Sequence, residues 1–160
     1  MYHWARGGLA LALIPVMFVW MNLVYAPAAT PAGILSDRVG RLKVLLGGLA
    51  ALTVADLTLA LAPALGGVFV GGALWGLYMG LSQGRLSTLV ADTAPEGLRG
   101  TAFGLFNLLT GAALLIASIL AGWLWDAFGS TATFLAGAVL SGFAALIMAI
   151  RMKAQQLPPN

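Results

Sequence analysis

The chain has 160 residues, of which 61% are hydrophobic and only 8% are charged. Soluble domains carry roughly 25% charged residues, so this composition and a mean hydropathy of +0.97 exclude a soluble, a nucleic-acid-binding and a disordered protein. The absence of cysteine excludes disulfides, thiolate metal sites and a cysteine nucleophile. A net charge of +3 in so apolar a chain is typical of loops at the cytoplasmic face of a membrane.

Long uncharged stretches divide the chain into membrane-spanning segments. A helix needs about 20 apolar residues to cross the hydrocarbon core of a bilayer, and the backbone of a spanning segment must form its hydrogen bonds internally. The sequence therefore predicts an all-α, polytopic membrane protein with a single transmembrane domain. Its five expected transmembrane helices cover residues 8–35, 44–62, 66–91, 100–124 and 131–150, and residues 151–160 form a cytoplasmic tail.

The first expected helix is long and contains Pro15, Pro27 and Pro31. Each interior proline removes a helix hydrogen bond, so kinks are expected. A competing interpretation is a cleaved signal peptide that ends near the small residues 26–28. The apolar run is longer than the roughly 7–15 residues of a signal peptide, and it leads directly into a charged motif, so a transmembrane helix is favoured.

A charged motif with two glycines follows the first helix: Gly33-Ile-Leu-Ser-Asp37-Arg38-Val-Gly40-Arg41. Its glycines allow a tight turn and a close approach of helices. Its aspartate lies at a membrane boundary, where a carboxylate caps the N-terminus of a neighbouring helix and complements its dipole. Its arginines face lipid headgroups or pair with acids. Alternatively, all three charges are solvated turn residues on the cytoplasmic side.

Asp56 is an acid inside the second expected helix. A carboxylate at that depth is costly, which makes Asp56 a candidate for ion or proton coupling. Alternatively, burial keeps this carboxyl neutral, or it reaches the outer interface. Three further polar residues are expected to form hydrogen bonds between helices: Asn22, Asn107 and Thr110.

The third expected helix has two contrasting faces. Glycines recur every four residues, at Gly72, Gly76, Gly80 and Gly84, which predicts a ridge on which another helix packs closely. A second set lies on nearly the opposite face: Trp75, Tyr78, Ser82 and Arg85. This set either lines a cavity and contacts substrate, or forms an interfacial aromatic belt with core packing. The arginine of the set snorkels to the cytoplasmic face or pairs with Asp92.

The motif at residues 33–41 resembles the loop signature of the major facilitator superfamily, which has glycine, aspartate and arginine at this spacing. Residues 95–104 are similar to the family's turn between helices ten and eleven, and residues 121–129 to its end of helix eleven. The whole chain thus resembles helices eight to twelve of a twelve-helix transporter, a partial bundle without the first seven helices. One departure is Leu42, where the family usually has a second basic residue.

The resemblance implies a cytoplasmic latch that closes the inner gate. In that family the aspartate of the signature meets the start of helix eleven, and the second arginine pairs with an acid at the end of helix ten. The matching elements are Asp37 with the start near Gly100, and Arg41 with Asp92. The resemblance also implies that helix ten lines the central cavity. Helix nine, which would carry Asp56, is a peripheral support helix in the family, and this counts against coupling at that residue.

Basic residues are distributed unequally between the two expected sides of the membrane. One side holds Arg38, Arg41, Lys43, Arg99, Arg151 and Lys153, and the other holds Arg6. The positive-inside rule therefore predicts an N-terminus outside and a cytoplasmic C-terminus, in a cell inner or plasma membrane. An odd number of helices in this orientation predicts that earlier helices are missing.

The sequence contains no set of residues suited to catalysis. The single histidine, His3, lies at the terminus, no His, Cys and carboxylate cluster has the spacing of a metal site, and the glycines form no nucleotide-binding pattern. We therefore expect no enzyme activity, no metal, no cofactor and no nucleic-acid partner.

Two functions remain open. The first is transport of a small solute as the C-terminal part of a secondary transporter, by efflux or proton-coupled exchange. The second is a non-transporting truncated protein or a helix-packing scaffold. Alternating access requires one bundle to rock against another, so we expect the chain to be inactive alone and to need a partner chain or upstream segment that supplies the missing helices.

Overall fold

The computed structural model describes residues 3–61, 64–82, 85–95 and 97–155, with side chains described from residue 13 onward except at 85 and 155. The regular secondary structure of these residues is entirely helical. The helices are α1 (His3–Val39), α2 (Arg41–Leu61), α3 (Leu65–Ser82), α4 (Arg85–Thr93) and α5 (Arg99–Gln155). The predicted all-α class is therefore confirmed.

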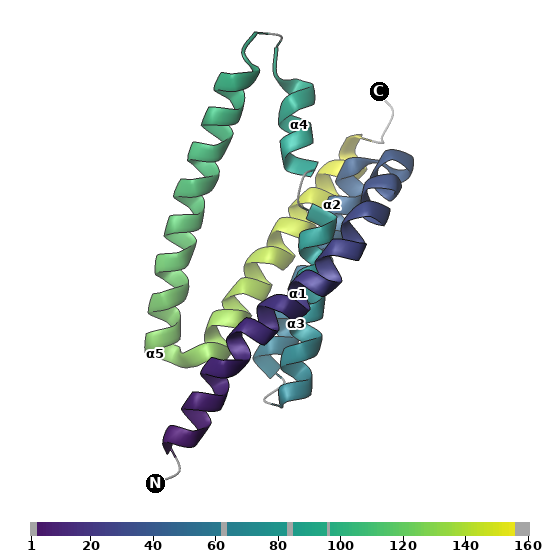
Figure 1. The fold of residues 1–160 in the computed structure, drawn as a ribbon. Coiled ribbons are helices and arrows are strands. Elements are labelled where there is room, and N and C mark those ends of the chain that lie inside the picture. The colour runs from purple at the N-terminus through teal and green to yellow at the C-terminus, as the bar shows by residue number, and fades with distance from the viewer. Residues whose placement is uncertain (1–2, 62–63, 83–84, 96, 156–160) are drawn as a thin grey trace.

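Four stretches are long and apolar enough to cross a membrane: Leu13–Val39, Arg41–Leu61, Leu65–Thr93 and Arg99–Ala154. The third comprises α3 and α4 and includes two residues outside the described part of the chain. The last has 56 residues, more than twice the length of about 20 residues that one crossing requires. Gly129 divides it, because its φ of 82° and ψ of 177° are not helical. Figure 1 shows that the two parts of α5 run in opposite directions. We call residues 99–128 the first arm and residues 130–155 the second arm, and together with the other stretches they account for five crossings.

The helices differ from the expected ranges in three places. α1 is a single helix through Pro15, Pro27 and Pro31. The expected helix 66–91 corresponds to two helices, α3 and α4, and residues 83 and 84 between them lie outside the described part of the chain. The connection between the last two crossings is reduced to a single non-helical residue, Gly129.

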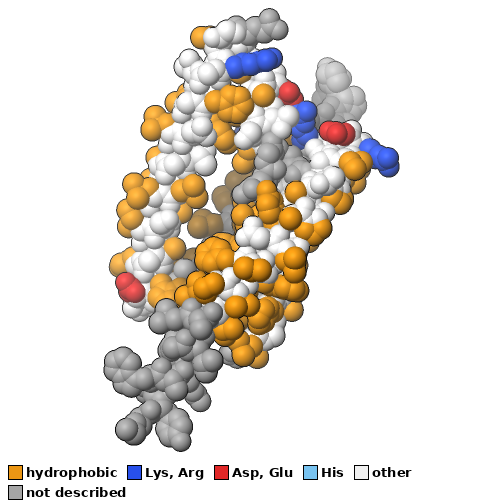
Figure 2. Space-filling view, viewed as in Figure 1, with side chains coloured by type: hydrophobic (Ala, Val, Ile, Leu, Met, Phe, Trp, Pro, Cys, Tyr) orange, Lys and Arg blue, Asp and Glu red, His pale blue; other side chains and the backbone are white. Residues whose placement is uncertain are grey.

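Four segments form a packed cluster in the order α1, α3, α2 and the second arm of α5. The first arm stands apart from this cluster (Figure 1), and its large apolar side chains, such as Leu108 and Leu115, are exposed. Hydrophobic side chains also cover the visible flank of the cluster (Figure 2). An apolar exterior of this kind suits helices that are surrounded by lipid.

Glycines of α3 form the close interface with α1. The residues that face α1 are Gly72, Gly76 and Gly80. A Cβ atom added to Gly76 would lie 2.5 Å from the Met21 carbonyl oxygen, and one added to Gly80 would lie 2.9 Å from Cβ of Ala28. The predicted glycine ridge is therefore confirmed at these three positions, while Gly84 lies outside the described residues.

Candidate functional site

The charged motif forms the connection between α1 and α2. Gly40 has a φ of 97°, a conformation that glycine adopts without steric cost. Its N–H donates to the Ser36 carbonyl oxygen at 3.0 Å, which closes α1, and α2 begins at the next residue. The predicted tight turn thus lies at Gly40. Gly33 lies inside α1 with nothing within 4 Å of an added Cβ, so no helix of the described residues approaches closely at Gly33.

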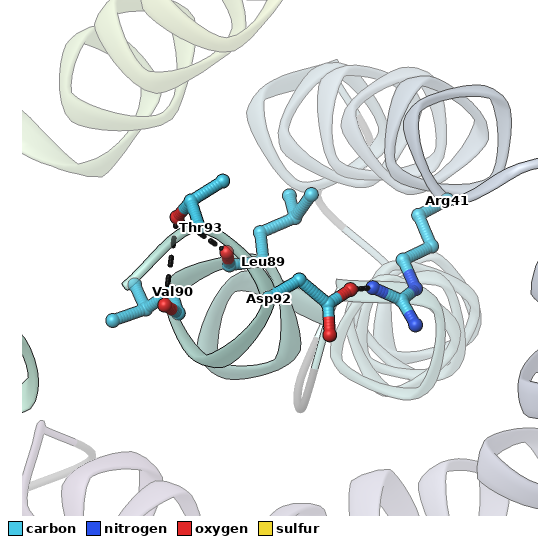
Figure 3. A network of polar contacts seen from close by, with 5 residues as sticks. All are labelled: Arg41, Leu89, Val90, Asp92 and Thr93. Atoms are coloured by element: carbon cyan, nitrogen blue, oxygen red, sulfur yellow. Dashed lines mark hydrogen bonds and ion pairs between the residues drawn. The ribbon is translucent and has the colours of Figure 1, made fainter. Parts of the chain in front are cut away.

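Arg41 and Asp92 form an ion pair between the first residue of α2 and the last turn of α4 (Figure 3). Figure 3 shows the guanidinium and the carboxylate pointing toward one another. Their side chains are 33% and 52% exposed, so solvent screens the pair and its contribution to stability is at most about 1 kcal/mol. The partners are those that the family signature implies.

The aspartate and the first arginine of the motif, Asp37 and Arg38, are exposed at the end of α1. Among the described residues, no ion pair or hydrogen bond of Asp37 is found, and α1 makes no extensive contact with α5. An added Cβ at Gly100 would also meet nothing within 4 Å. The expected contact between Asp37 and the start of the fourth crossing is therefore absent from this structure. Of the two expected latch contacts, only the pair of Arg41 and Asp92 is formed among the described residues.

Asp56 lies at the junction of α2, α3 and the second arm of α5, and it is only 5% exposed. Its Oδ1 accepts a hydrogen bond from the Trp75 indole Nε1–H of α3, at 3.2 Å. Its Oδ2 lies against Gly137 of the second arm, where an added Cβ would come within 2.8 Å of that oxygen. The carboxyl group is therefore buried between helices and does not reach the outer interface.

A hydroxyl pair lies one helical turn from this carboxyl and links the same two segments. Thr53 Oγ1 of α2 and Ser141 Oγ of the second arm are 3.0 Å apart. The Thr53 hydroxyl is also 2.9 Å from the Leu49 carbonyl oxygen, to which it donates. Gly137 and Ser141 were not among the residues expected to form a site. The two residues are four positions apart, which is the spacing of small residues at transmembrane helix interfaces. This spacing could have predicted that they face a neighbouring helix.

The proposed cavity face of α3 turns largely toward α2. The Tyr78 ring lies beside Gly48 of α2. Ser82 is buried, and its hydroxyl donates to the Tyr78 carbonyl oxygen at 2.8 Å. Trp75 is 38% exposed while its indole N–H bonds to Asp56. The side chain of Arg85, and with it the expected pairing or snorkelling, lies outside the described residues.

Two of the polar residues expected between helices bond within their own helices instead. The Asn22 amide donates to the Phe18 carbonyl oxygen at 2.8 Å, and the Thr110 hydroxyl donates to that of Phe106 at 2.7 Å. The prediction of interhelical bonds is therefore wrong at both. Short side chains next to the helix backbone reach a carbonyl of the preceding turn more readily than a distant helix. Asn22 lies on an exposed apolar face of α1, with Phe18 and Leu23 among its neighbours.

Comparisons with known proteins identify related sequences. The sequence model of the family described as Major Facilitator Superfamily matches residues 2–159. An uncharacterised MFS-type transporter of Methanocaldococcus jannaschii is 34% identical over 137 residues, which are 85% of this chain and 34% of that protein. A tetracycline resistance protein, class G, of Vibrio anguillarum is 34% identical over 137 residues, which are 86% of this chain and 34% of that protein.

A third relative is the inner membrane transport protein YajR of Escherichia coli. It is 30% identical over 140 residues, which are 88% of this chain and 30% of that protein. The chain thus spans about a third of the length of the relatives that it matches. No solved structure matches the chain.

Proposed function

Because the chain belongs to the Major Facilitator Superfamily, a family of membrane transporters, we propose that it forms helices eight to twelve of a secondary transporter for a small solute. It is an integral, multi-pass membrane protein. The ion pair between Arg41 and Asp92 carries this proposal. It joins the charged turn to the end of α4, as the latch of such a transporter requires.

The latch closes the cytoplasmic side of the transport pathway. Arg41 follows the turn at Gly40 directly, so the position of the guanidinium is set by the start of α2. Asp92 lies in the last turn of α4, which contacts both α3 and α5. A pair that is half exposed to solvent is weak, and a weak pair suits a gate that must open in each transport cycle.

The solute that we propose is an apolar, aromatic compound moved out of the cell. One relative is named a tetracycline resistance protein, and resistance that depends on a transporter suggests export of the compound. The exposed apolar face of α1 around Phe18 and Leu23 and the partly exposed Trp75 ring offer surfaces of matching chemistry. Ligand sites are lined mostly by apolar and aromatic side chains with a few polar groups.

Asp56 is the residue that we propose for coupling transport to an ion. Ionisable residues inside spanning segments are costly and by default functional, and Asp56 is buried among three helical segments. Because the carboxyl group lies between α2, α3 and the second arm, a change in its charge would alter how these segments pack.

The orientation that we propose places the connections α1–α2 and α4–α5 and the end of α5 in the cytoplasm. Arg38, Arg41 and Arg99 lie at these connections, and Arg151 and Lys153 lie at the end of α5. The first arm of α5 has exposed apolar side chains and stands apart from the cluster. We propose that it packs on further helices, supplied by a partner chain or an upstream segment.

Reconstitution in liposomes tests this function. The 160-residue chain would be compared with a longer protein that adds seven upstream helices, using tetracycline and an imposed proton gradient. We expect uptake by the longer protein, a strong reduction by Arg41→Gln, and none by the chain alone. Saturable uptake by the chain alone, abolished by Asp37→Asn, would contradict the proposal. Absence of transport by both proteins for any solute tried would favour the alternative of a helix-packing scaffold.

A further inference from the structure

We infer that the ligand of the Asp56 carboxyl group is a proton bound at Oδ2, that no metal cation binds there, and that Trp75 and Gly137 determine this choice. The inference deepens the proposed coupling role of Asp56 and rests on it. It assigns a chemical class to the coupling ion and a positioning role to a tryptophan that the sequence analysis placed on a cavity face.

Oδ1 of the carboxyl is already occupied by a donor. The indole N–H of Trp75 points at this oxygen, with 3.2 Å between Nε1 and Oδ1. An indole nitrogen is a donor only, so the oxygen must act as an acceptor whether the carboxyl group is charged or neutral. A cation at Oδ1 would have to displace this N–H and lie beside its positive end. The proton of the neutral acid therefore resides on the other oxygen.

Oδ2 lies against the backbone of the second arm at Gly137. An added Cβ at Gly137 would lie 2.8 Å from Oδ2 and 3.3 Å from the carboxyl carbon, which is closer than ordinary van der Waals contact. The segment comes this close because residue 137 has no side chain. A proton adds almost no volume at this oxygen, whereas a cation with its own ligands requires more room than the close approach of Gly137 leaves on that side of Oδ2.

The surrounding groups do not supply the oxygen ligands of a metal ion. Cation sites inside membranes use carbonyl oxygens of unwound helices, but α2 and α3 are unbroken, and the second arm has no described break after Gly129. The nearby Thr53 hydroxyl is engaged with Leu49 and Ser141. In the described part of the chain, a cation at this junction would find only the carboxylate itself.

No other charge faces this carboxyl from the elements that pack on it. α3 carries no charged residue between Leu65 and Ser82, and its titratable Tyr78 lies beside Gly48, two turns away along α2. The second arm carries none between Gly129 and Ile150. On α2 the charged residues besides Asp56 are Arg41 and Lys43 at its beginning. Uptake of a proton therefore changes this junction from one negative charge to none.

The chemical change is confined to one bond. Protonation forms an O–H bond at Oδ2, and release returns that proton to water, while Oδ1 keeps the Trp75 hydrogen bond in both states. A neutral carboxyl is far less costly in a low-dielectric interior than a carboxylate. The proton thus alters the free energy of the junction of α2, α3 and the second arm, and with it the tendency of these segments to stay packed.

Infrared difference spectroscopy on the 160-residue chain in lipid nanodiscs tests the inference. The probes are protons and sodium ions, with choline replacing sodium as the control. We expect a carboxylic acid C=O band that appears as the pH falls, is lost in Asp56→Asn, and is unchanged when sodium replaces choline. Trp75→Phe keeps an aromatic ring but removes the N–H donor, so the band should move to higher frequency.

Trp20→Phe is the matched control, because the Trp20 indole donates to the Phe69 carbonyl oxygen and not to Asp56. It should leave the band in place. Loss of the band on addition of sodium, an unshifted band in Trp75→Phe, or the absence of any band assigned to Asp56 would overturn the inference. The coupling role is tested separately: unchanged proton-driven uptake by the longer protein carrying Asp56→Asn would refute coupling, even where the infrared result holds.

Discussion

Gly76 of α3 lies so close to Met21 of α1 that the two helices touch through backbone atoms. An added Cβ at Gly76 would stand 2.5 Å from the Met21 carbonyl oxygen and 3.2 Å from Cβ of Val24. Backbone atoms have no rotamer by which to move aside. Because lipid tails are as apolar as the side chains, such close packing is a main source of helix association in membranes.

Gly76→Ala should therefore destabilise the bundle, by about 1–3 kcal/mol, the usual cost of overpacking. Unfolding by SDS, followed by circular dichroism, measures the change. Gly111→Ala is the matched control, since no atom lies within 4 Å of an added Cβ on the first arm at that position. Equal stabilities of the two variants would mean that the α1–α3 contact does not limit stability.

The pair of Arg41 and Asp92 should show a small and salt-sensitive coupling energy. Both side chains are about a third or more exposed, so a double-mutant cycle with Arg41→Gln and Asp92→Asn should give at most about 1 kcal/mol. High salt should reduce it further. Arg38→Gln should not couple to Asp92→Asn, and coupling of similar size in that control pair would point to a general charge effect in place of a specific contact.

The hydroxyls of Thr53 and Ser141 should contribute modestly to the contact between α2 and the second arm. Their oxygens are 3.0 Å apart, and hydrogen bonds between transmembrane helices average about 0.6 kcal/mol in double-mutant cycles. The measurement is the cycle of Thr53→Val and Ser141→Ala in SDS unfolding. Thr110→Val is the control, because that hydroxyl bonds to its own helix, and we expect no coupling between it and Ser141→Ala.

Cysteines at the ends of two helices should be labelled from opposite sides of the membrane. Val39 ends α1 and Leu65 begins α3, and both side chains are exposed. With a membrane-impermeant maleimide on intact cells, Leu65→Cys should react directly and Val39→Cys only after permeabilisation. The unmodified chain contains no cysteine and serves as the background. Reaction of both variants from one side would contradict the proposed orientation.

The membrane class and the helical content followed from the sequence. Uncharged stretches of about 20 residues have one low-energy form in lipid, because each backbone N–H and C=O must bond within the segment. The repeat of glycines at Gly72, Gly76 and Gly80 also fixed a close-packing face, since residues four apart lie on one side of a helix. The positive φ needed for the turn at Gly40 was equally local.

The partners of these faces were decided only by the tertiary structure. The spacing of residues along a helix predicts which of them share a face, but it does not predict which neighbouring helix packs against that face. Trp75 has the spacing of a cavity residue, yet its indole bonds to Asp56. The closeness of Gly137 to that same carboxyl depends on how the second arm returns after Gly129. A contact between distant segments is set by the free energy of the whole assembled bundle, so no local pattern could predict the surroundings of Asp56.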